Sequence, residues 1–498
     1  MMYLPKSISS VLAFLLALCI IIAGVFYART TIAQSSFIGN LPPGYTTYPG
    51  QLVMGKSCSC ATGGISGAPA LAPPCATNVC FGSSFTRYGF IFTRAEGINS
   101  TACDQIRRRT PSLPPCFQLD GDDAVLISGS ISPLQNLSYY GFTLYQSLIY
   151  NSNYRSNYAG IQSSVGLNLN KANLKLGNNG KYVLIFTAST RTLNVIKQAL
   201  QRMSVPNTII NHYPIPNTVA NLGKIDYPDQ LTLQLRLTAQ SSEDKQQINT
   251  FVQQSAPETN VLFIKAPGEN GDITFDSIPK WEDTLRSNTI EYKMGLDRQL
   301  ALLERSVTNT YARQGYNVKA RLTESLIHVD PKECIASTIG CVYDSPDALY
   351  GSFPCDFSPT TLRSGNCFIQ LEQTSDDVLM LLGVDHTLVG DQTLAAYFSD
   401  ESRTGAGSKD GTFSFVGLST QGSAKQYWPR SKGDDLYAVK IARDCGDSPY
   451  CASVPFLGDV SDPTGFYIVG RTYLDKVTAS GPNPANLIPA VLLWFSKS

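Results

Sequence analysis

The sequence KYVLIFT at Lys181–Thr187 opens the stretch that decides the expected fold, and this stretch runs to Ala266. The segment is a short apolar run typical of a buried strand. A helix is expected after it, because apolar residues recur three or four positions apart on one face, namely Leu193, Ile196, Leu200 and Met203. Pro206 is expected to end that helix, and Thr208–His212 (TIINH) to form a second strand.

The same order recurs in the second half of this stretch. Leu231–Thr238 (LTLQLRLT) is typical of a strand, and Ser241–Asp244 (SSED) is typical of a helix start with an acidic first turn. Ile248, Phe251 and Val252 give this helix an apolar face, and Asn260–Ala266 (NVLFIKA) is the fourth strand. The order β-α-β-β-α-β predicts a ferredoxin-like unit whose helices each cover one sheet face.

Further strand-forming sequences lie on both sides of this unit. Upstream we expect strands at Thr86–Thr93, Asp123–Ser130, Ser138–Tyr150 and Ile161–Leu169. Downstream we expect them at Val318–His328, Val378–Val384, Thr393–Phe398, Gly411–Val416, Leu436–Ile441, Gly465–Tyr473 and Ala490–Phe495. Between these groups, an apolar stripe predicts one long helix from about 286 to 313. Short strands with Gly-, Ser- and Asp-rich connections favour a sandwich-like body.

The fold class predicted is therefore α+β: a mainly antiparallel β body, sandwich-like, with an inserted ferredoxin-like βαββαβ unit and one long helix. Whether the early strands join the late sheet or fold separately is left open by the sequence. We predict six regions: a signal peptide or membrane anchor (1–33), a Cys/Pro/Gly-rich irregular region (34–120), a β segment (121–175), the ferredoxin-like unit (176–270), the long helix (271–317) and a disulfide-stapled β domain (318–498).

The N-terminus indicates export. Val11–Tyr27 is apolar throughout, and its 17 residues fit both a signal-peptide core and a short membrane-spanning helix. Ala33 lies at a small-x-small site that a signal peptidase could cut. Two outcomes therefore stay open, cleavage after Ala33 or membrane attachment through residues 11–27. In both, the remainder of the chain is expected outside the cytoplasm, at the cell surface, in a periplasm or secreted.

The cysteines support an oxidising compartment. Cys19 lies inside the apolar segment, and the other twelve of the 13 cysteines form sequence-local groups. We predict the pairs Cys334–Cys341, Cys355–Cys367 and Cys445–Cys451. The first six cysteines allow fifteen pairings, which the sequence does not resolve: Cys58, Cys60, Cys75, Cys80, Cys103 and Cys116. Their spacing does not match a thiolate zinc site, so no metal is predicted.

Charge and missing motifs exclude several classes of function. Lys plus Arg equals Asp plus Glu, 39 each, so the chain has no net field that would attract nucleic acid. No glycine-rich phosphate loop, zinc-protease helix or nucleophile elbow is present, and no cofactor is indicated.

The chain has three histidines, which limits histidine-based chemistry. His386 follows the expected strand Val378–Val384, and Asp385 beside it could orient its ring for acid–base work. His328 also ends an expected strand, so a meeting of His328 and His386 could create a catalytic or metal site. A structural histidine, hydrogen-bonded near a strand end, is the competing interpretation, and it applies more strongly to His212.

Two further features admit a binding role or a plain structural one. Acidic clusters at Asp120–Asp123 and Gly433–Asp435 could hold calcium, although turn chemistry explains them equally well. Aromatic residues that could line a ligand-binding face are Tyr139, Tyr140, Phe142, Tyr145, Tyr150, Tyr154 and Tyr158. The competing interpretation is ordinary half-buried sheet surface.

These observations lead to two competing functions. The expected one is a secreted or membrane-anchored protein without catalysis, which binds a ligand or a surface macromolecule. The alternative is a secreted hydrolase or lyase with a site around His386 and nearby carboxylates.

Overall fold

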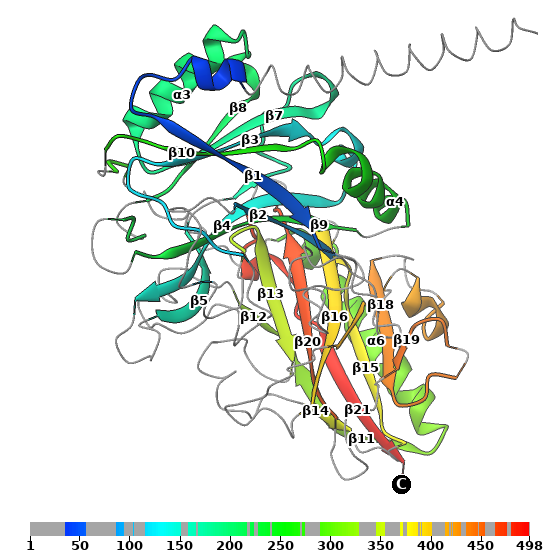
Figure 1. Ribbon diagram of the computed structural model, residues 1–498. Coiled ribbons are helices and arrows are strands. Elements are labelled where there is room, and N and C mark those ends of the chain that lie inside the picture. Colours follow the sequence, from blue (N-terminus) through cyan, green and yellow to red (C-terminus); the bar gives the residue numbers. More distant parts are fainter. Residues whose placement is uncertain are drawn as a thin grey trace, which may run out of the picture.

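The computed structural model describes most of the chain outside its N-terminus. The described residues are 35–55, 86–93, 103, 115–150, 158–165, 168–216, 220–223, 228–239, 242–268, 271–273, 289–327, 345–353, 369–371, 376–386, 389, 391–400, 414–417, 420, 422–429, 435–446, 448–453, 464–475 and 480–497. They form a mixed α+β protein with few helices, in which most strands belong to curled antiparallel sheets (Figure 1). The predicted α+β, mainly antiparallel class is confirmed at this level.

The first sheet has ten strands and contains the N-terminal half of the described chain. In spatial order they are β5 (Tyr158–Ser164), β4 (Tyr139–Tyr150), β9 (Gln230–Thr238), β2 (Thr86–Phe92), β1 (Thr46–Met54), β10 (Asn260–Lys265), β3 (Ala124–Ser130), β7 (Lys181–Thr187) and β8 (Ile210–Pro214), with β6 (Leu169–Asn170) on β4. Strand β1 lies in the stretch that was expected to be irregular.

Strand β1 joins two halves of this sheet. Its first part, Thr46–Gly50, pairs with β10, whereas Gln51–Met54 pairs with β2. Side chains from both halves meet in one hydrophobic core, including Phe263 of β10 and Leu235 of β9. The sheet therefore curls around its own core. Phe251, which begins the turn of π-helix Phe251–Ser255 after α4 (Ser242–Thr250), packs into the same core.

Helix α3 (Thr190–Arg202) covers the other face of the half that contains β3, β7 and β10. Its apolar stripe, including Ile196 and Leu200, packs against residues of those strands such as Ile185 and Leu262. The Ser189 side chain caps the helix by accepting a 3.3 Å hydrogen bond from the Thr192 N–H, as N-cap serines do. Strands β7 and β8, which α3 connects, run parallel.

The expected inserted ferredoxin-like unit is not what these strands form. All six elements of the predicted order are present, as β7, α3, β8, β9, α4 and β10. However, β3 lies between β7 and β10, and β9 pairs with β4 and β2 instead of β7. Upstream strands are thus interleaved with those of the supposed insertion. The order of elements along the chain does not determine which strands pair, because strand edges form hydrogen bonds with any strand that the fold places beside them.

The C-terminal half forms two smaller sheets. The five-stranded sheet has the order β11 (Tyr316–Thr323), β21 (Val491–Lys497), β15 (Val378–Val384), β18 (Leu436–Ala442) and β19 (Cys451–Ser453). The six-stranded sheet has the order β12 (Ser325–Ile327), β13 (Ala348–Phe353), β20 (Thr464–Tyr473), β16 (Asp391–Asp400) and β17 (Ser414–Gly417), with β14 (Ile369–Leu371) on β20. Among the strands that the structure describes, the early ones therefore do not join the late sheets.

Each face of the five-stranded sheet is covered. Leu379 and Leu381 of β15 share a core with Phe353 and Ile468 of the six-stranded sheet. On the opposite face, Met380 and Leu382 pack against the stripe of α6 (Leu296–Ala312). This alternation is the period-two pattern of a strand buried on both sides.

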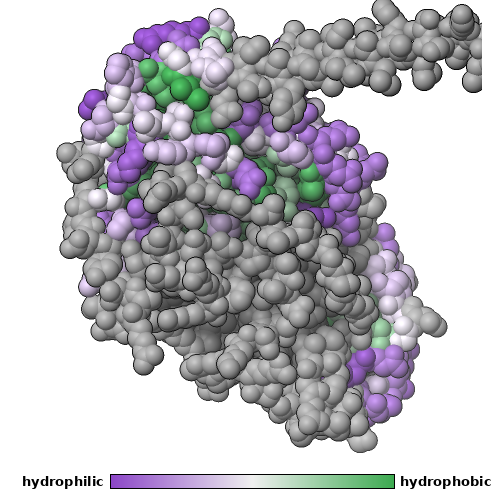
Figure 2. Space-filling view, viewed as in Figure 1, coloured by the Kyte–Doolittle hydropathy of each residue, from purple (hydrophilic) through white to green (hydrophobic). Residues whose placement is uncertain are grey.

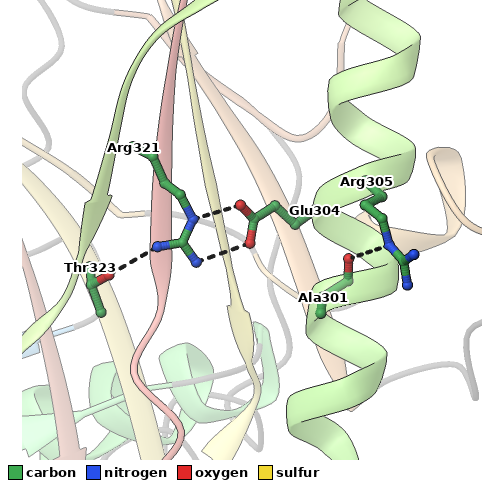
Figure 3. A network of polar contacts seen from close by, with 5 residues as sticks. All are labelled: Ala301, Glu304, Arg305, Arg321 and Thr323. Atoms are coloured by element: carbon green, nitrogen blue, oxygen red, sulfur yellow. Dashed lines mark hydrogen bonds and ion pairs between the residues drawn. The ribbon is translucent and has the colours of Figure 1, made fainter.

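A surface ion pair also ties α6 to the edge strand β11. The Arg321 guanidinium donates to both carboxylate oxygens of Glu304, at 2.6 and 3.1 Å, and to the Thr323 hydroxyl at 3.2 Å (Figure 3). Because Arg321 is half exposed, this bridge contributes on the order of 1 kcal/mol or less.

The long helix is shorter than expected. Residues 274–288 lie outside the described residues, and a short helix α5 (Ile290–Lys293) precedes α6. Gly295 separates the two with φ of +70°, a left-handed conformation that favours glycine and interrupts helical backbone. Residues 35–39 form a further short helix. Short 3-10 turns lie at Ser132–Leu134, Asn178–Gly180, Asn207–Ile209, Ser423–Gln426 and Pro484–Asn486.

Two disulfides lie among the described residues. Cys445–Cys451 confirms a predicted pair, and Cys103–Cys116 resolves one pair of the first group. Such bonds are consistent with a location outside the cytoplasm. The other eight cysteines of the predicted set, Cys58, Cys60, Cys75, Cys80, Cys334, Cys341, Cys355 and Cys367, lie outside the described residues, as does the segment 11–27. None of the helices in the described ranges has the length and apolar character needed to cross a membrane.

Candidate functional site

Strand β9 carries the most unusual polar surface in the described structure. Its leucines at alternate positions, such as Leu233 and Leu235, point into the core of the curled sheet. The intervening residues point to the other face and are all polar, yet none is more than 3% exposed: Gln230, Thr232, Gln234, Arg236 and Thr238. Polar side chains are seldom buried so completely unless a partner or a function requires it.

The C-terminal half of the protein covers this face. Tyr139 of β4 stacks on Tyr473 of β20, with ring centroids 4.3 Å apart. The Tyr139 hydroxyl donates a 2.8 Å hydrogen bond to Asp347, and the Asn168 amide donates to the Ser345 hydroxyl at 3.2 Å. In Figure 1 the ends of β13 and β20 accordingly meet the part of the first sheet that contains β4 and β9.

We call this set of buried residues the polar junction. It comprises Tyr139, Thr143, Tyr145, Gln234, Arg236 and Thr238 from the first sheet, and Asp347, Tyr350 and Tyr473 from the C-terminal half; each is at most 3% exposed. The strand register places them together. Thr143 is opposite Gln234, and Tyr139 is opposite Thr238, so each pair lies on one face.

Arg236 is the cation at the centre of the polar junction. Its Nη2 donates to the Tyr145 hydroxyl at 3.1 Å, and its guanidinium carbon lies 5.5 Å from the centre of the Tyr88 ring. Burial by itself would lower the pKa of Arg236, but nearby phenols outweigh it and hold this pKa well above its ordinary value. Those phenols belong to Tyr145, Tyr88, Tyr473 and Tyr350. Arg236 is therefore positively charged at every physiological pH.

Asp347 is the carboxylate of the polar junction. Burial raises its pKa to about 6, although hydrogen bonds from Asn168, Tyr139 and Asn170 and the charge of Arg236 each act in the opposite direction. Gly141 lies opposite Arg236, and a Cβ at this position would collide with the Tyr139 hydroxyl. The glycine thus allows the Tyr139–Asp347 pair to approach the guanidinium.

Several polar atoms of the junction have no hydrogen-bond partner among the described residues. They are Thr143 Oγ1, Gln234 Oε1, Thr238 Oγ1 and Tyr473 OH, and Asn168 Oδ1 beside them. Buried polar atoms without partners are uncommon in native proteins, and each calls for an explanation such as a bound water or ligand. The polar junction can therefore recognise a molecule by hydrogen bonds and charge.

His386 occupies a second buried polar cluster. Its Nδ1 lies 2.7 Å from Glu291 Oε1, and the two residues are 1% and 0% exposed. Glu324 is nearby, since its charge and that of Glu291 both act on the imidazole. Burial would lower the pKa of His386, but the hydrogen bond and charge of Glu291 raise it above the ordinary value. Burial also raises the pKa of Glu324.

Both glutamates of this cluster hold the segment that leads into β21. Glu291 Oε2 accepts from the Ile488 N–H at 2.8 Å, and Glu324 Oε2 accepts from the Ala490 N–H at 2.9 Å. Across the described ranges, no three His, Cys, Asp or Glu side chains are arranged to hold a metal ion. The two hydrogen bonds of Glu291 and Glu324 tie the segment before β21 to this cluster.

The predicted histidine candidates are only partly brought together. His386 does meet a carboxylate, but this is Glu291, which sequence proximity did not suggest. Asp385 is half-buried; its N–H donates to the Asp435 carbonyl at 2.9 Å, and its charge acts on His386. His328 lies outside the described residues. A catalytic role for His386, Asp385 and His328 stays a prediction.

The remaining sequence candidates fall in several environments. His212 lies in β8, and burial, with the charge of Lys197, lowers its pKa to about 4. Asp123 closes a turn, because its carboxylate accepts from the Asp120 and Ala266 N–H groups. Of the aromatic run, Tyr140 and Phe142 lie in the hydrophobic core, whereas Tyr139 and Tyr145 belong to the polar junction.

Sequence reasoning missed Arg236 and Asp347. The signal was present in LTLQLRLT, where polar residues alternate with leucines along the strand. Outside the junction, large exposed hydrophobic residues are scattered: Ile38, Tyr150, Ile290, Met294, Leu302 and Val318. Figure 2 agrees, since the coloured surface on that side is largely hydrophilic with small separate hydrophobic areas.

Comparisons with known proteins add no function. No family model and no curated protein matches the chain. Solved structures that resemble it include an uncharacterized protein from Burkholderia cenocepacia, at 11% identity and a TM-score of 0.35, covering 93% of this chain and 85% of that one. Another is the VPA0106 protein from Vibrio parahaemolyticus, at 12% identity and a TM-score of 0.33, covering 75% and 87%. Likenesses at these scores indicate no function for this chain.

Proposed function

We propose that this chain is an extracytoplasmic protein, secreted or anchored through residues 11–27, that binds a ligand or a surface macromolecule without catalysing a reaction. The observation that carries the proposal is the polar junction, where a buried guanidinium and unpartnered hydroxyl and amide oxygens lie together. Desolvated groups of this kind suit recognition, because hydrogen bonds and charge act strongly away from water. The disulfides support the location.

The alternative, a hydrolase or lyase around His386, has weaker support. A general acid or base must reach the atom whose proton it transfers. His386 Nδ1 lies 2.7 Å from one carboxylate oxygen of Glu291, and the second oxygen of Glu291 accepts from the Ile488 N–H. These contacts favour a structural histidine.

A finer description of the fold belongs to the same proposal. The five- and six-stranded sheets are inferred to form a β-sandwich on which the first sheet rests. Their shared core, with Leu379 and Leu381 on one side and Phe353 and Ile468 on the other, supports this arrangement.

The test uses the full chain produced with its disulfides intact. Its thermal unfolding is followed with a panel of sugars, organic acids, amino acids and phosphates, for the wild type and for Arg236→Lys. We expect at least one compound to raise the unfolding midpoint of the wild type by several degrees. This rise should be lost in Arg236→Lys, because the ammonium group of lysine does not reproduce the planar set of donors of the guanidinium.

A second arm addresses the enzyme alternative. The wild type and His386→Asn are incubated with chromogenic esters, glycosides and phosphates. Turnover by the wild type that is abolished in His386→Asn would overturn the proposal, and so would a panel in which no compound stabilises the protein.

A further inference from the structure

We propose that one end of the ten-stranded sheet rests on the anionic headgroups of the membrane that holds residues 11–27; this rests on the anchored form of the proposed function and adds its orientation. The net charge of the chain is zero, but its charges are unevenly distributed. From Ala124 to Ile225 the sequence contains no Asp or Glu. Such an asymmetry favours contact with an anionic surface. The cations of this stretch are Arg155, Lys171, Lys175, Lys181, Arg191, Lys197, Arg202 and Lys224.

Four of these cations lie around the C-terminal end of α3. Lys181 begins β7, and the Lys175 N–H donates to the Asn211 side chain of the neighbouring β8 at 2.7 Å. Gln201 of α3 donates to the Asn207 side chain, just before β8, at 3.4 Å. Three of the four side chains are exposed and the fourth, that of Lys197, is half-buried. We call this set the basic end: Lys175, Lys181, Lys197 and Arg202.

Positive charge exceeds negative charge at the basic end. None of its four side chains is paired with a carboxylate among the residues that the structure describes. Glu258, two residues before β10, brings one negative charge toward this edge of the sheet. Asp272 lies at the other end of α3, where its carboxylate accepts from the Thr190 N–H at 2.6 Å. The basic end therefore complements an anionic surface.

The chain that follows the export segment packs at this same end. Phe37, in the short helix of residues 35–39, is 3% exposed and shares a core with Leu200 of α3. Arg202 Nη1 donates to the Asn40 carbonyl at 3.0 Å. Figure 1 accordingly shows the helix of residues 35–39 beside α3, at the opposite end of the molecule from the C-terminus.

The short distance along the chain keeps this end near the bilayer. Ser35 follows Tyr27, the last residue of the apolar segment, by eight positions. A chain of that length reaches at most about 28 Å in any conformation. In the anchored protein the basic end therefore stays close to the membrane, whereas the C-terminal half points away from it.

A lipid surface fits this end better than an acidic protein does. Cations near an anionic bilayer are attracted to its headgroups, and the attraction falls off within about 10 Å at 0.1 M salt. Ile38, beside Phe37, is 44% exposed. An exposed apolar side chain next to cations suits the boundary between headgroups and acyl chains. The apolar segment 11–27 itself supplies the reason for a bilayer to be present here.

Amine labelling of the full, disulfide-intact chain in lipid nanodiscs tests this orientation. Discs of phosphatidylcholine alone are compared with discs to which phosphatidylglycerol adds anionic headgroups, and an uncharged succinimidyl ester acetylates exposed lysines. We expect Lys175, Lys181 and Lys197 to react at least about threefold more slowly in the anionic discs. Lys293, an exposed lysine of α5 in the C-terminal half, should react equally in both. High salt should abolish the difference, because it screens the headgroup charge.

One substitution tests the charge and leaves the three lysines as reporters. In Arg202→Glu the acetylation rates in the two kinds of disc should agree within about twofold, because a cation of the basic end has become an anion. The matched control is Arg305→Glu, since Arg305 is exposed on the side of α6 away from Arg321 (Figure 3). This variant should keep the threefold difference of the wild type.

Each other outcome would overturn the orientation. Equal acetylation of the basic-end lysines in both kinds of disc would do so, as would protection of Lys293 in their place. Protection by added polyglutamate in phosphatidylcholine discs, without protection by phosphatidylglycerol, would assign the basic end to an acidic protein. An intact mass that lacks residues 1–33 would remove the anchor and leave the secreted form of the binding function. Failure of that binding function would appear separately, in the compound panel described above.

Discussion

The Tyr139 hydroxyl donates a 2.8 Å hydrogen bond to Asp347, and this bond joins the ten-stranded sheet to the segment that leads into β13. Both residues are buried, and the two lie 208 positions apart in the sequence. The same tyrosine stacks on Tyr473. One side chain therefore takes part both in joining the two halves of the protein and in forming the polar junction.

Removing this hydroxyl is expected to destabilise the protein. In Tyr139→Phe the buried carboxylate of Asp347 loses a donor, which should cost about 1–3 kcal/mol in the free energy of unfolding. Urea unfolding of the full chain measures the change. Tyr45→Phe is the matched control, since the Tyr45 hydroxyl is buried without a partner among the described residues and should cost nothing. An equal loss in both variants would contradict the role given to Tyr139.

The stability of the protein should depend on pH through Asp347. Its pKa is about 6 in the folded protein against 3.8 as the ordinary value. Because the folded protein binds this proton more tightly than the unfolded chain does, protonation of Asp347 stabilises the fold. The contribution to the free energy of unfolding is complete below about pH 4 and is lost as the pH rises through about 6. The loss amounts to about 3 kcal/mol, because a pKa that differs by one between the folded and unfolded protein corresponds to about 1.4 kcal/mol.

Asp347→Asn removes this titration and isolates its contribution. Between pH 4 and pH 7, the free energy of unfolding of the variant should fall less steeply than that of the wild type. Asp123 and Asp229 also have pKa values raised by burial to about 6, so they supply the same trend in both proteins. Parallel curves for the two proteins would show that Asp347 does not titrate as described.

Glu291 should determine the charge state of His386. In Glu291→Gln the imidazole loses its carboxylate partner, so its pKa should fall, which NMR titration of the ring measures. Breaking a buried pair should also cost about 3 kcal/mol in unfolding free energy. Glu304→Gln serves as control, because Glu304 pairs with Arg321 at the surface and its loss should cost under about 1 kcal/mol. An unchanged titration of His386 in Glu291→Gln would refute the assignment.

The two described disulfides should differ modestly in their contribution. The Cys103–Cys116 loop spans 13 residues and the Cys445–Cys451 loop spans 6, so chain entropy predicts about 3 and about 2 kcal/mol. Paired Cys→Ser substitutions and urea unfolding test these values. Peptide mapping without reduction reports whether Cys103–Cys116 and Cys445–Cys451 are formed, and intact mass reports whether the chain is cut after Ala33. Free thiols at these four positions would contradict the extracytoplasmic assignment.

Local structure could be predicted well where hydrophobic periodicity is strong. The strands Lys181–Thr187 and Val378–Val384 have the predicted bounds. Each is a continuous apolar run, because the side chains on both faces of the strand are buried. The helix over Leu193–Leu200 was predicted from its apolar stripe. Strand β1 was missed, since TTYPGQLVM contains Pro and Gly and shows little alternation.

Long-range contacts could not be predicted from such patterns. Nothing local in the sequence places β3 between β7 and β10, which was the reason that the ferredoxin-like expectation was wrong. For His386, the sequence suggested the adjacent Asp385, whereas the partner Glu291 lies 95 residues away. The polar junction likewise depends on a contact between the N-terminal and C-terminal halves of the protein. No pattern in the sequence therefore indicated that Arg236 and Asp347 lie close together.

The most direct test of the central claim is the thermal unfolding of the full, disulfide-intact chain with the panel of sugars, organic acids, amino acids and phosphates. We expect at least one compound to raise the unfolding midpoint of the wild type by several degrees, and this rise to be lost in Arg236→Lys. A panel in which no compound raises the wild-type midpoint, or a rise that Arg236→Lys retains in full, would contradict the claim.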